Sequence, residues 1–185
     1  SPGCNPSKLS SSQPFAIRFR AQDHRYSWND LLLGQQSFSA TKQTDDFVIK
    51  RKEGFYSYQL AVVCDDIEQR ITHIVRGSDL LDSTPPQLAL YDALTLSTPQ
   101  FGHIPVITNS AGQKLSKQNL APSINSTFAS QNLQQALDAL NHPLPTTLYN
   151  APADEIIDWA IKNWSLNQVP KSQSIQDEWH TNPEL

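Results

Sequence analysis

A strand, a helix and a second strand follow one another between residues 71 and 108, and this order constrains the fold most strongly. Apolar residues recur over 71–76, a helix is predicted over 85–96, and an apolar run returns at 103–108. Two strands joined by a crossover helix form a parallel βαβ unit. We therefore predict an α/β fold built from layers of helix and sheet.

The start of the predicted helix carries a capping signature. Thr84 can accept hydrogen bonds from the first turn, Pro85 suits the first helical position, and Gln87 can complete a capping box. The run at 60–64 is ambiguous, because its valines favour a strand while the acidic residues after it could continue a helix. Further elements are predicted as strands at 15–20 and 46–50, and as helices at 131–140 and from Pro152 onward.

Charge limits the classes of partner. The 185 residues carry a net charge of −4 and the pI is about 5.6, so no overall basic field attracts nucleic acid. Any contact with RNA therefore has to be local. Basic residues gather in two small clusters, a size that is usually solvated surface: Arg18, Arg20 and Arg25, and Lys50, Arg51 and Lys52.

Neither membrane insertion nor a disulfide framework is indicated. No apolar stretch is long enough to span a membrane, and no signal peptide opens the chain. Cys4 and Cys64 stand far apart in different contexts, so we expect a reducing cytoplasm. The chain contains no methionine and begins with Ser1. Either an initiator was trimmed or an N-terminal region is missing, and we favour the second.

A segment with two lysines, 113–119, follows the last strand of the βαβ unit, and we name it the lysine loop. Lys114 and Lys117 stand three positions apart in it, with Ser116 between them. Lysine is a strongly hydrated point charge that can follow a moving phosphate, so the pair suits the polyphosphate of a nucleotide. For so short a motif, a solvated surface loop is the alternative.

Four segments, in order, resemble the catalytic core of the class I glutamyl-tRNA synthetases: 46–52, 58–66, 71–85 and the lysine loop. The resemblance is closest to a short bacterial paralogue within this family and covers roughly residues 15–119. It implies the second half of a class I Rossmann-type nucleotide-binding domain with part of its insertion, followed by a small helical region.

The resemblance also implies roles for individual side chains. The lysine loop matches the family's KMSKS-type signature in a KLSK form, so Lys117 would stabilise charge on the ATP phosphates, supported by Lys114 and Ser116. Tyr58 matches a tyrosine whose hydroxyl helps to hold the amino acid. Arg76 matches an arginine whose planar guanidinium suits a substrate carboxylate. From the residues alone, Tyr58 could equally be an interior tyrosine and Arg76 a surface charge at a strand end.

Several neighbouring residues receive structural interpretations. His73 lies three positions from Arg76 on one predicted strand and so faces the other side, which favours a structural role. Asp79 and Asp82 could contact ribose or cap the following helix, and capping is the simpler interpretation. Pro86 stands where the family typically has arginine in a Thr-Pro-Arg-Gln block.

The family also has a zinc site, formed by a Cys-x-Cys pair and a Tyr-x-x-x-Cys segment. Cys4 matches the last of these ligands, which implies an incomplete Zn²⁺ site in this chain, since one thiolate cannot complete a tetrahedral site. A loop cysteine without a role is the alternative. The resemblance further implies ATP with Mg²⁺, and it places the HIGH-type phosphate motif in the missing N-terminal part.

These observations predict five regions along the chain. They are a remnant of the zinc-binding insertion (1–14), a β-rich insertion segment (15–57), the second half of the nucleotide-binding domain (58–122), a helical region (123–170) and a flexible tail (171–185).

The resemblance to the paralogue implies a reaction for the intact protein. The paralogue activates glutamate with ATP and transfers the glutamyl group to the queuosine base of tRNA(Asp). Too few residues follow Lys117 for the large anticodon-binding region of a discriminating synthetase, and Gln118 also fits the paralogue. A fragment of a discriminating glutamyl-tRNA synthetase and a non-catalytic RNA-binding fragment are the alternatives. We expect a cytoplasmic monomer, and we expect the isolated chain to be inactive.

Overall fold

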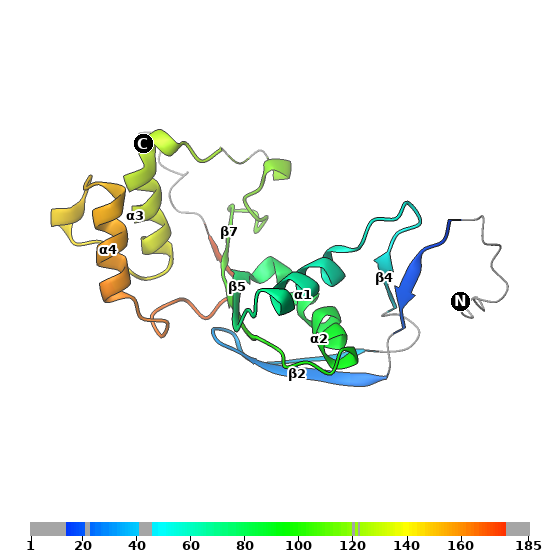
Figure 1. Cartoon of the computed structure of the whole chain (residues 1–185). Coiled ribbons are helices and arrows are strands. Elements are labelled where there is room, and N and C mark those ends of the chain that lie inside the picture. The colour runs from blue at the N-terminus through cyan, green and yellow to red at the C-terminus, as the bar shows by residue number, and fades with distance from the viewer. Residues whose placement is uncertain (1–13, 21–22, 41–45, 120, 122, 177–185) are drawn as a thin grey trace. The chain divides into compact units, whose positions relative to one another are not determined.

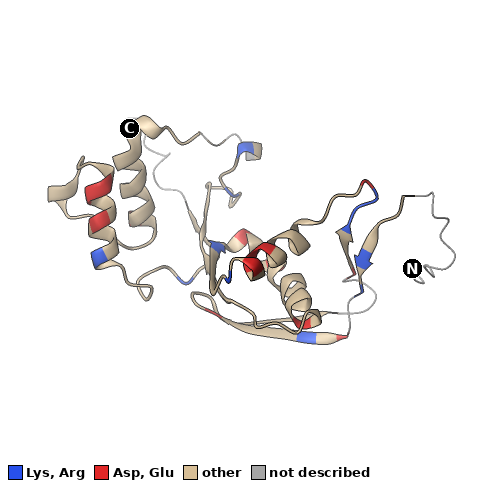
Figure 2. Cartoon of the chain, viewed as in Figure 1, with Lys and Arg blue, Asp and Glu red and all other residues tan. Residues whose placement is uncertain are grey.

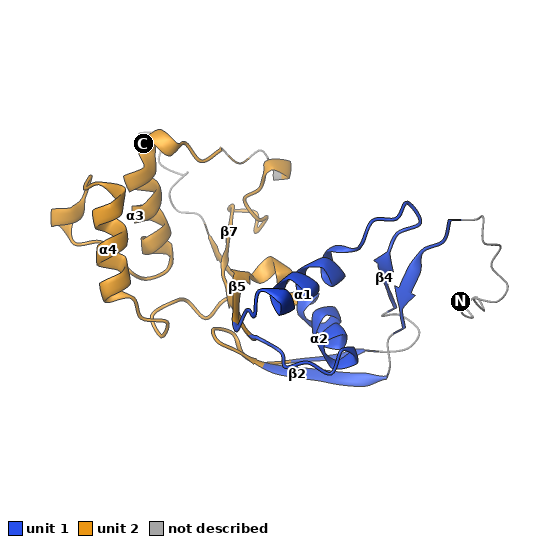
Figure 3. Cartoon of the chain, viewed as in Figure 1, with its two compact units in different colours: residues 1–28, 37–72, 82–99 blue, residues 29–36, 73–81, 100–185 orange. Residues whose placement is uncertain are grey.

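The computed structural model describes residues 14–20, 23–40, 46–119, 121 and 123–176. The chain divides into two compact units, each built from several segments (Figure 3). Unit 1 comprises residues 1–28, 37–72 and 82–99, and unit 2 comprises residues 29–36, 73–81 and 100–185.

Unit 1 combines a small antiparallel sheet with two helices (Figure 1). Strand β1 (Ile17–Phe19) pairs antiparallel with β4 (Phe47–Lys50), close to the predicted strands. Helix α1 (Tyr58–Glu68) resolves the ambiguous run at 60–64, because the Ser57 side chain accepts a hydrogen bond from the Leu60 N–H and so caps a helix. The core of unit 1 contains Val63 from α1 and two residues of helix α2 (Thr84–Ala93), Leu90 and Tyr91.

Helix α2 (Thr84–Ala93) begins differently from the prediction. Ser83 occupies the N-cap position and makes no side-chain capping bond, so the predicted capping box is wrong. The 3₁₀ helix η2 (Ser78–Ser83) leads directly into α2, which leaves no extended residue to serve as a cap. Thr84 and Gln87 are buried instead, and Gln87 donates a hydrogen bond of 2.9 Å to the Gln59 side chain.

A hairpin that the sequence analysis missed precedes these elements. Strands β2 (His24–Asp30) and β3 (Gly34–Ala40) form a two-stranded sheet. Gly34, with a φ of +70°, provides the left-handed backbone that begins the return strand. The tip of the hairpin, residues 29–36, belongs to unit 2.

The parallel pairing predicted for the βαβ unit is confirmed, but its second strand begins at Gln100, three residues before the predicted start. Strand β5 (His73–Gly77) pairs in parallel with β6 (Gln100–Ile104), and the connection between them runs through η2 and α2. The strand predicted at 103–108 is split at Pro105, which has no N–H to donate to a ladder.

The second part of that predicted strand belongs to another sheet. Strand β7 (Val106–Thr108) pairs in parallel with β8 (Ser174–Gln176). Residues 174–176, which we had placed in a flexible tail, therefore form a strand. Residues 177–185 of that predicted tail lie outside the described part of the chain.

Two helices of unit 2 follow the predicted positions closely. Helices α3 (Ala129–Ala139) and α4 (Ala153–Asn163) contact each other around a core of Leu137, Leu144 and Ile156. Asp154 and Glu155 occupy the first turn of α4, where negative charge is favoured by the helix dipole. Within the described ranges, no helix has both the length and the apolarity needed to cross a bilayer.

Candidate functional site

Arg76 is held on unit 2 by two side chains of the neighbouring strand. Arg76 and His103 are register partners in the parallel β5–β6 pair, so both side chains lie on one face of it. The Arg76 Nε–H donates a hydrogen bond of 3.0 Å to Nε2 of His103. The guanidinium carbon also lies 5.3 Å from the ring centre of Phe101, within the range of a cation–π contact.

His103 in turn connects Arg76 to a buried carboxylate. Nδ1 of His103 lies 2.5 Å from Oδ2 of Asp30, and both side chains are 0% exposed. The other Asp30 oxygen, Oδ1, accepts hydrogen bonds of 3.1 Å from the backbone N–H groups of Leu32, Leu33 and His103. We name these four side chains the arginine cluster: Asp30, His103, Arg76 and Phe101.

Hydrogen bonding decides the charge of the Asp30 carboxyl. Burial alone would raise its pKa, since a buried carboxylate loses hydration. The bonds from the His103 ring and from the backbone N–H groups of Leu33, His103 and Leu32 oppose burial, and together they lower the pKa of Asp30 below its usual value. The cluster therefore contains an ionised carboxylate that is fully supplied with donors.

The lysine loop is presented by the turn that follows β7. The Asn109 side-chain oxygen accepts hydrogen bonds from the backbone N–H groups of Ala111 and Gln113, at 3.0 and 2.9 Å. Gly112, with a φ of +76°, allows the chain to reverse. The Leu115 N–H then donates to the Ile107 carbonyl at 2.8 Å, so the loop returns alongside β7.

The two lysines of the loop are held differently. Nζ of Lys114 lies 2.6 Å from Oδ2 of Asp79, in an ion pair whose side chains are 46% and 36% exposed. Asp79, one of the two acidic residues predicted to cap α2, thus pairs with Lys114 of the lysine loop instead. Lys117 begins the short 3₁₀ helix η3 (Lys117–Asn119) and is exposed, and no ion pair is found for it among the described residues. Ser116 is half-buried beside it.

Tyr58, the other predicted substrate contact, belongs to unit 1. It is the first residue of α1 and is 53% exposed, so it is not the interior tyrosine that was the alternative. Its neighbour Gln59 accepts the hydrogen bond from Gln87 of α2. Arg76, Lys114, Ser116 and Lys117 all belong to unit 2.

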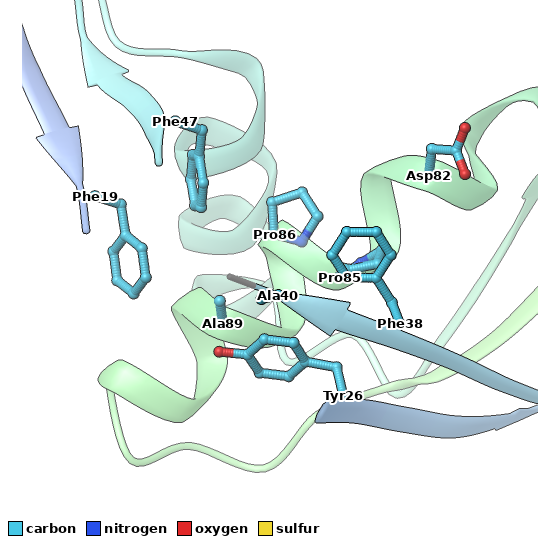
Figure 4. Close-up of a pocket in the computed structure, with 9 residues that line it drawn as sticks. All are labelled: Phe19, Tyr26, Phe38, Ala40, Phe47, Asp82, Pro85, Pro86 and Ala89. Atoms are coloured by element: carbon cyan, nitrogen blue, oxygen red, sulfur yellow. The ribbon is translucent and has the colours of Figure 1, made fainter. Parts of the chain in front are cut away.

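Unit 1 also contains an apolar pocket (Figure 4). The rings of Phe19 and Phe47 stack in it with centroids 5.1 Å apart, and Asp82 is the one carboxylate among the lining residues. A pocket with this lining suits an apolar group, and it has no lysine or arginine to bind a polyphosphate. Its lining consists of Phe19, Tyr26, Phe38, Ala40, Phe47, Asp82, Pro85, Pro86 and Ala89.

The predicted metal ligand is not among the described residues, because Cys4 lies outside them. Within the described ranges, no group of three or more histidine, cysteine or acidic side chains could hold a metal ion. The described residues alone therefore do not form a zinc site, and the predicted role of Cys4 stays a prediction. Strands β1 and β4 of unit 1 each contain a lysine or arginine residue (Figure 2), and Arg18 of β1 donates a hydrogen bond to the Asp46 carbonyl.

No local sequence pattern marks Asp30, Phe101 or His103 as members of the site. One signal was available for His103, which occupies an apolar strand where a histidine needs hydrogen-bond partners. For Asp30, the signal was its place just before the Leu31–Leu33 run and Gly34, a typical turn-forming position. His73 is exposed on β5, and Cys64 is a free, exposed cysteine of α1.

Comparison with known families gives a match over most of the chain. The family described as "tRNA synthetases class I (E and Q), catalytic domain" matches residues 5–142. Among solved structures, a glutamate tRNA ligase from Elizabethkingia meningosepticum in complex with its amino acid is similar, with a TM-score of 0.66 and 26% identity. That similarity covers 88% of this chain and 36% of the other.

Several curated relatives share the name glutamyl-Q tRNA(Asp) synthetase, and three of them are compared below. The chain is 48% identical to the protein from Chromobacterium violaceum over 84% of its own length and 51% of the relative's. Identity to the Neisseria meningitidis serogroup C protein is 44%, over 92% and 56% of the two chains. For the Pseudomonas syringae pv. syringae protein it is 41%, over 88% and 55%. The chain thus spans about half the length of the curated relatives it matches.

Proposed function

The chain belongs to the class I tRNA synthetases for glutamate and glutamine and contains part of their catalytic domain, and from this membership we propose a specific reaction. The full-length protein activates glutamate with ATP and transfers the glutamyl group to the queuosine base of tRNA(Asp). The observation that carries the proposal is the identity of 48% with a glutamyl-Q tRNA(Asp) synthetase over 155 residues.

The exposed cations of the lysine loop support the first step of this reaction. A glutamate carboxylate oxygen attacks the α-phosphate of ATP, the bond to the β-phosphate breaks, and pyrophosphate leaves with additional negative charge. Lys117 stabilises that charge, because its ammonium group is exposed and can follow the phosphate as the bond lengthens. Lys114 and Ser116 support it from the same loop.

The fixed guanidinium of Arg76 supports amino-acid recognition. Arginine offers donors in a planar fork that matches a carboxylate, and the arginine cluster limits the directions in which this fork can point. We assign Arg76 to a carboxylate of glutamate and the hydroxyl of Tyr58 to the same substrate. ATP would be bound with Mg²⁺, and no step is assigned to zinc, because the described residues do not fit a zinc site.

The chain spans about half the length of its relatives, so we propose the reaction for the full-length protein and expect none from these 185 residues alone. We also propose a monomer that works in the cytoplasm.

Glutamate-dependent exchange between ATP and pyrophosphate tests the proposal. The full-length protein should exchange without tRNA, and the 185-residue chain should not. In a transfer assay, tRNA(Asp) with queuosine should accept labelled glutamate, whereas tRNA(Asp) without queuosine and tRNA(Glu) should not. Charging of tRNA(Glu) would instead indicate a discriminating glutamyl-tRNA synthetase. Absence of exchange by the full-length protein, with tRNA binding retained, would indicate a non-catalytic RNA-binding role.

A further inference from the structure

His103 is the most deeply buried polar side chain next to a candidate substrate-binding group. It contacts Arg76 through one ring nitrogen and Asp30 through the other, and its side chain is 0% exposed. A substrate cannot reach a side chain with no exposed surface. Any influence of His103 on the reaction is therefore indirect, and Arg76 is the candidate substrate-binding residue that it contacts.

The hydrogen bonds fix the position of the ring proton. An arginine Nε–H can only donate, so Nε2 of His103 must accept the bond of 3.0 Å. A neutral imidazole carries its single proton on the other nitrogen, so Nδ1–H of His103 donates to Oδ2 of Asp30. Asp30 therefore selects the tautomer that Arg76 requires.

Asp30 can perform this task because it is itself immobilised. Its Oδ1 accepts three backbone N–H groups, and two of them come from the turn that follows Asp30. The Leu31 N–H also donates to the Phe101 carbonyl at 2.8 Å, which joins this turn to β6. The orientation of the carboxylate is thus set by backbone atoms of two segments.

We propose that His103 and Asp30 are positioning residues that orient the guanidinium of Arg76 toward a substrate carboxylate. This proposal rests on the proposed function, because it takes the arginine to be the glutamate-binding group. Since the Nε–H is directed to His103, carboxylate recognition falls to the terminal amino groups of Arg76. A histidine with the other tautomer, or with both nitrogens protonated, would turn a donor toward Arg76 and displace the guanidinium.

Two substitutions of His103 separate its two contacts. In His103→Asn, the amide nitrogen can replace Nδ1 as the donor to Asp30, but the acceptor that Nε2 offers to the Arg76 Nε–H is lost. In His103→Gln, the longer side chain can place its amide oxygen near the position of Nε2, which keeps the acceptor and loses the donor to Asp30. If His103 positions Arg76, glutamate affinity should fall in the variant that loses the hydrogen bond to Arg76. It should not fall merely because a variant is less stable.

The measurement is the KM for glutamate and, separately, for ATP in the exchange reaction of the full-length protein. We expect His103→Asn to raise the glutamate KM by roughly tenfold, the usual effect of losing a hydrogen bond to a charged group, with little change in the ATP KM. His103→Gln should retain a glutamate KM near that of the unmutated protein, although its melting temperature falls.

His142 provides a matched control. It is also buried in unit 2, with Nδ1 2.6 Å from the Leu140 carbonyl and Nε2 accepting from the Ser165 N–H at 2.9 Å. Its ring nitrogens bond to backbone atoms and its ring stacks on Trp164, with centroids 4.3 Å apart, and none of these partners is a candidate substrate-binding residue. His142→Asn should therefore lower the melting temperature without raising the glutamate KM. In an Arg76→Lys background the effect of His103→Asn on this KM should disappear, because lysine has no Nε–H to position.

The outcomes distinguish the two proposals. Absence of exchange by the unmutated full-length protein would overturn the proposed function. Two results would overturn the positioning role alone. The first is exchange by His103→Asn with an unchanged glutamate KM. The second is that His103→Asn raises this KM in the Arg76→Lys background as much as it does in the unmutated protein. If His103→Asn does not fold, His103→Gln still decides, since a raised glutamate KM in that variant would contradict the proposal.

Discussion

The arginine cluster and the lysine loop both present cations, yet unit 2 holds them by opposite means. Arg76 is backed by a histidine and a carboxylate that are fully buried, and by backbone donors from two segments. Lys114 has an exposed ion pair, and Lys117 is exposed without an ion pair among the described residues. A planar carboxylate must be met in one orientation, whereas a phosphate that moves during bond cleavage is better served by adjustable point charges.

The largest expected difference between the two regions is in stability. Asp30→Ala leaves three backbone N–H groups and the His103 ring without their buried acceptor, so we expect the unfolding free energy to fall by about 3–5 kcal/mol. Urea denaturation followed by circular dichroism measures this loss. A loss below about 1 kcal/mol would show that water replaces the carboxylate and that the cluster is not a rigid support.

The second prediction separates binding from catalysis. Lys117→Ala should lower the kcat of ATP–pyrophosphate exchange by roughly 100-fold with little change in the glutamate KM, because the ammonium group stabilises charge that develops only during the reaction. Arg76→Ala should instead act mainly on the glutamate KM. Steady-state kinetics with each substrate varied in turn measures both effects. If the two variants showed the same pattern, the division of labour between the regions would be wrong.

Acid should weaken the arginine cluster, because it contains a carboxyl whose pKa is lowered in the folded protein. A carboxyl whose pKa is lower in the folded state stabilises the fold above the unfolded pKa, near 3.8 for Asp30, and this contribution is lost as the pH falls through the lowered folded pKa. The stability difference between the unmutated protein and Asp30→Asn should therefore be constant from neutral pH down to about pH 5 and shrink at lower pH. Thermal melts over this pH range measure the stability difference between the two proteins. A difference that grows in acid would contradict a lowered pKa for Asp30.

The smallest effect is expected for the ion pair of the lysine loop. Asp79→Ala should change the unfolding free energy by less than about 1 kcal/mol, because an exposed pair gains little over its hydration. Added salt should reduce even this effect, since exposed charges are screened. The same urea experiment compares it directly with Asp30→Ala. A loss as large as that of Asp30→Ala would mean that both cations are rigidly supported.

The sequence predicted the elements that local patterns define. Period-two and helical spacing placed β4, β5, α3 and α4, and the lysine loop was expected to follow a strand, as it does after β7. The split at Pro105 was missed because the apolar run continues across the proline without a change in pattern. The helical state of 60–64 required Ser57 as a cap, outside the run that was analysed.

The arginine cluster could not be predicted from local pattern. His103 and Asp30 are separated by 73 positions, and Arg76 and His103 by 27, so their contacts depend on strand pairing and on the missed β2–β3 hairpin. The roles of Arg76, Tyr58 and Lys117 came from family resemblance and remain predictions. Buried residues that orient a binding residue, as Asp30 and His103 do here, leave no pattern in the local sequence. The tertiary fold alone determines how far apart they lie in the chain.

The register of β5 against β6 has a consequence for how this region tolerates insertions and deletions. Arg76 faces His103 because each residue of β5 has a fixed partner on β6. Removing one residue between Gln100 and His103 would place Ile104 opposite Arg76 and turn the imidazole to the far side of the ribbon. The connection at 94–99 lies outside the ladder and can change in length without this inversion. Among natural variants, gaps should therefore gather in that connection and be absent from the strand beside it.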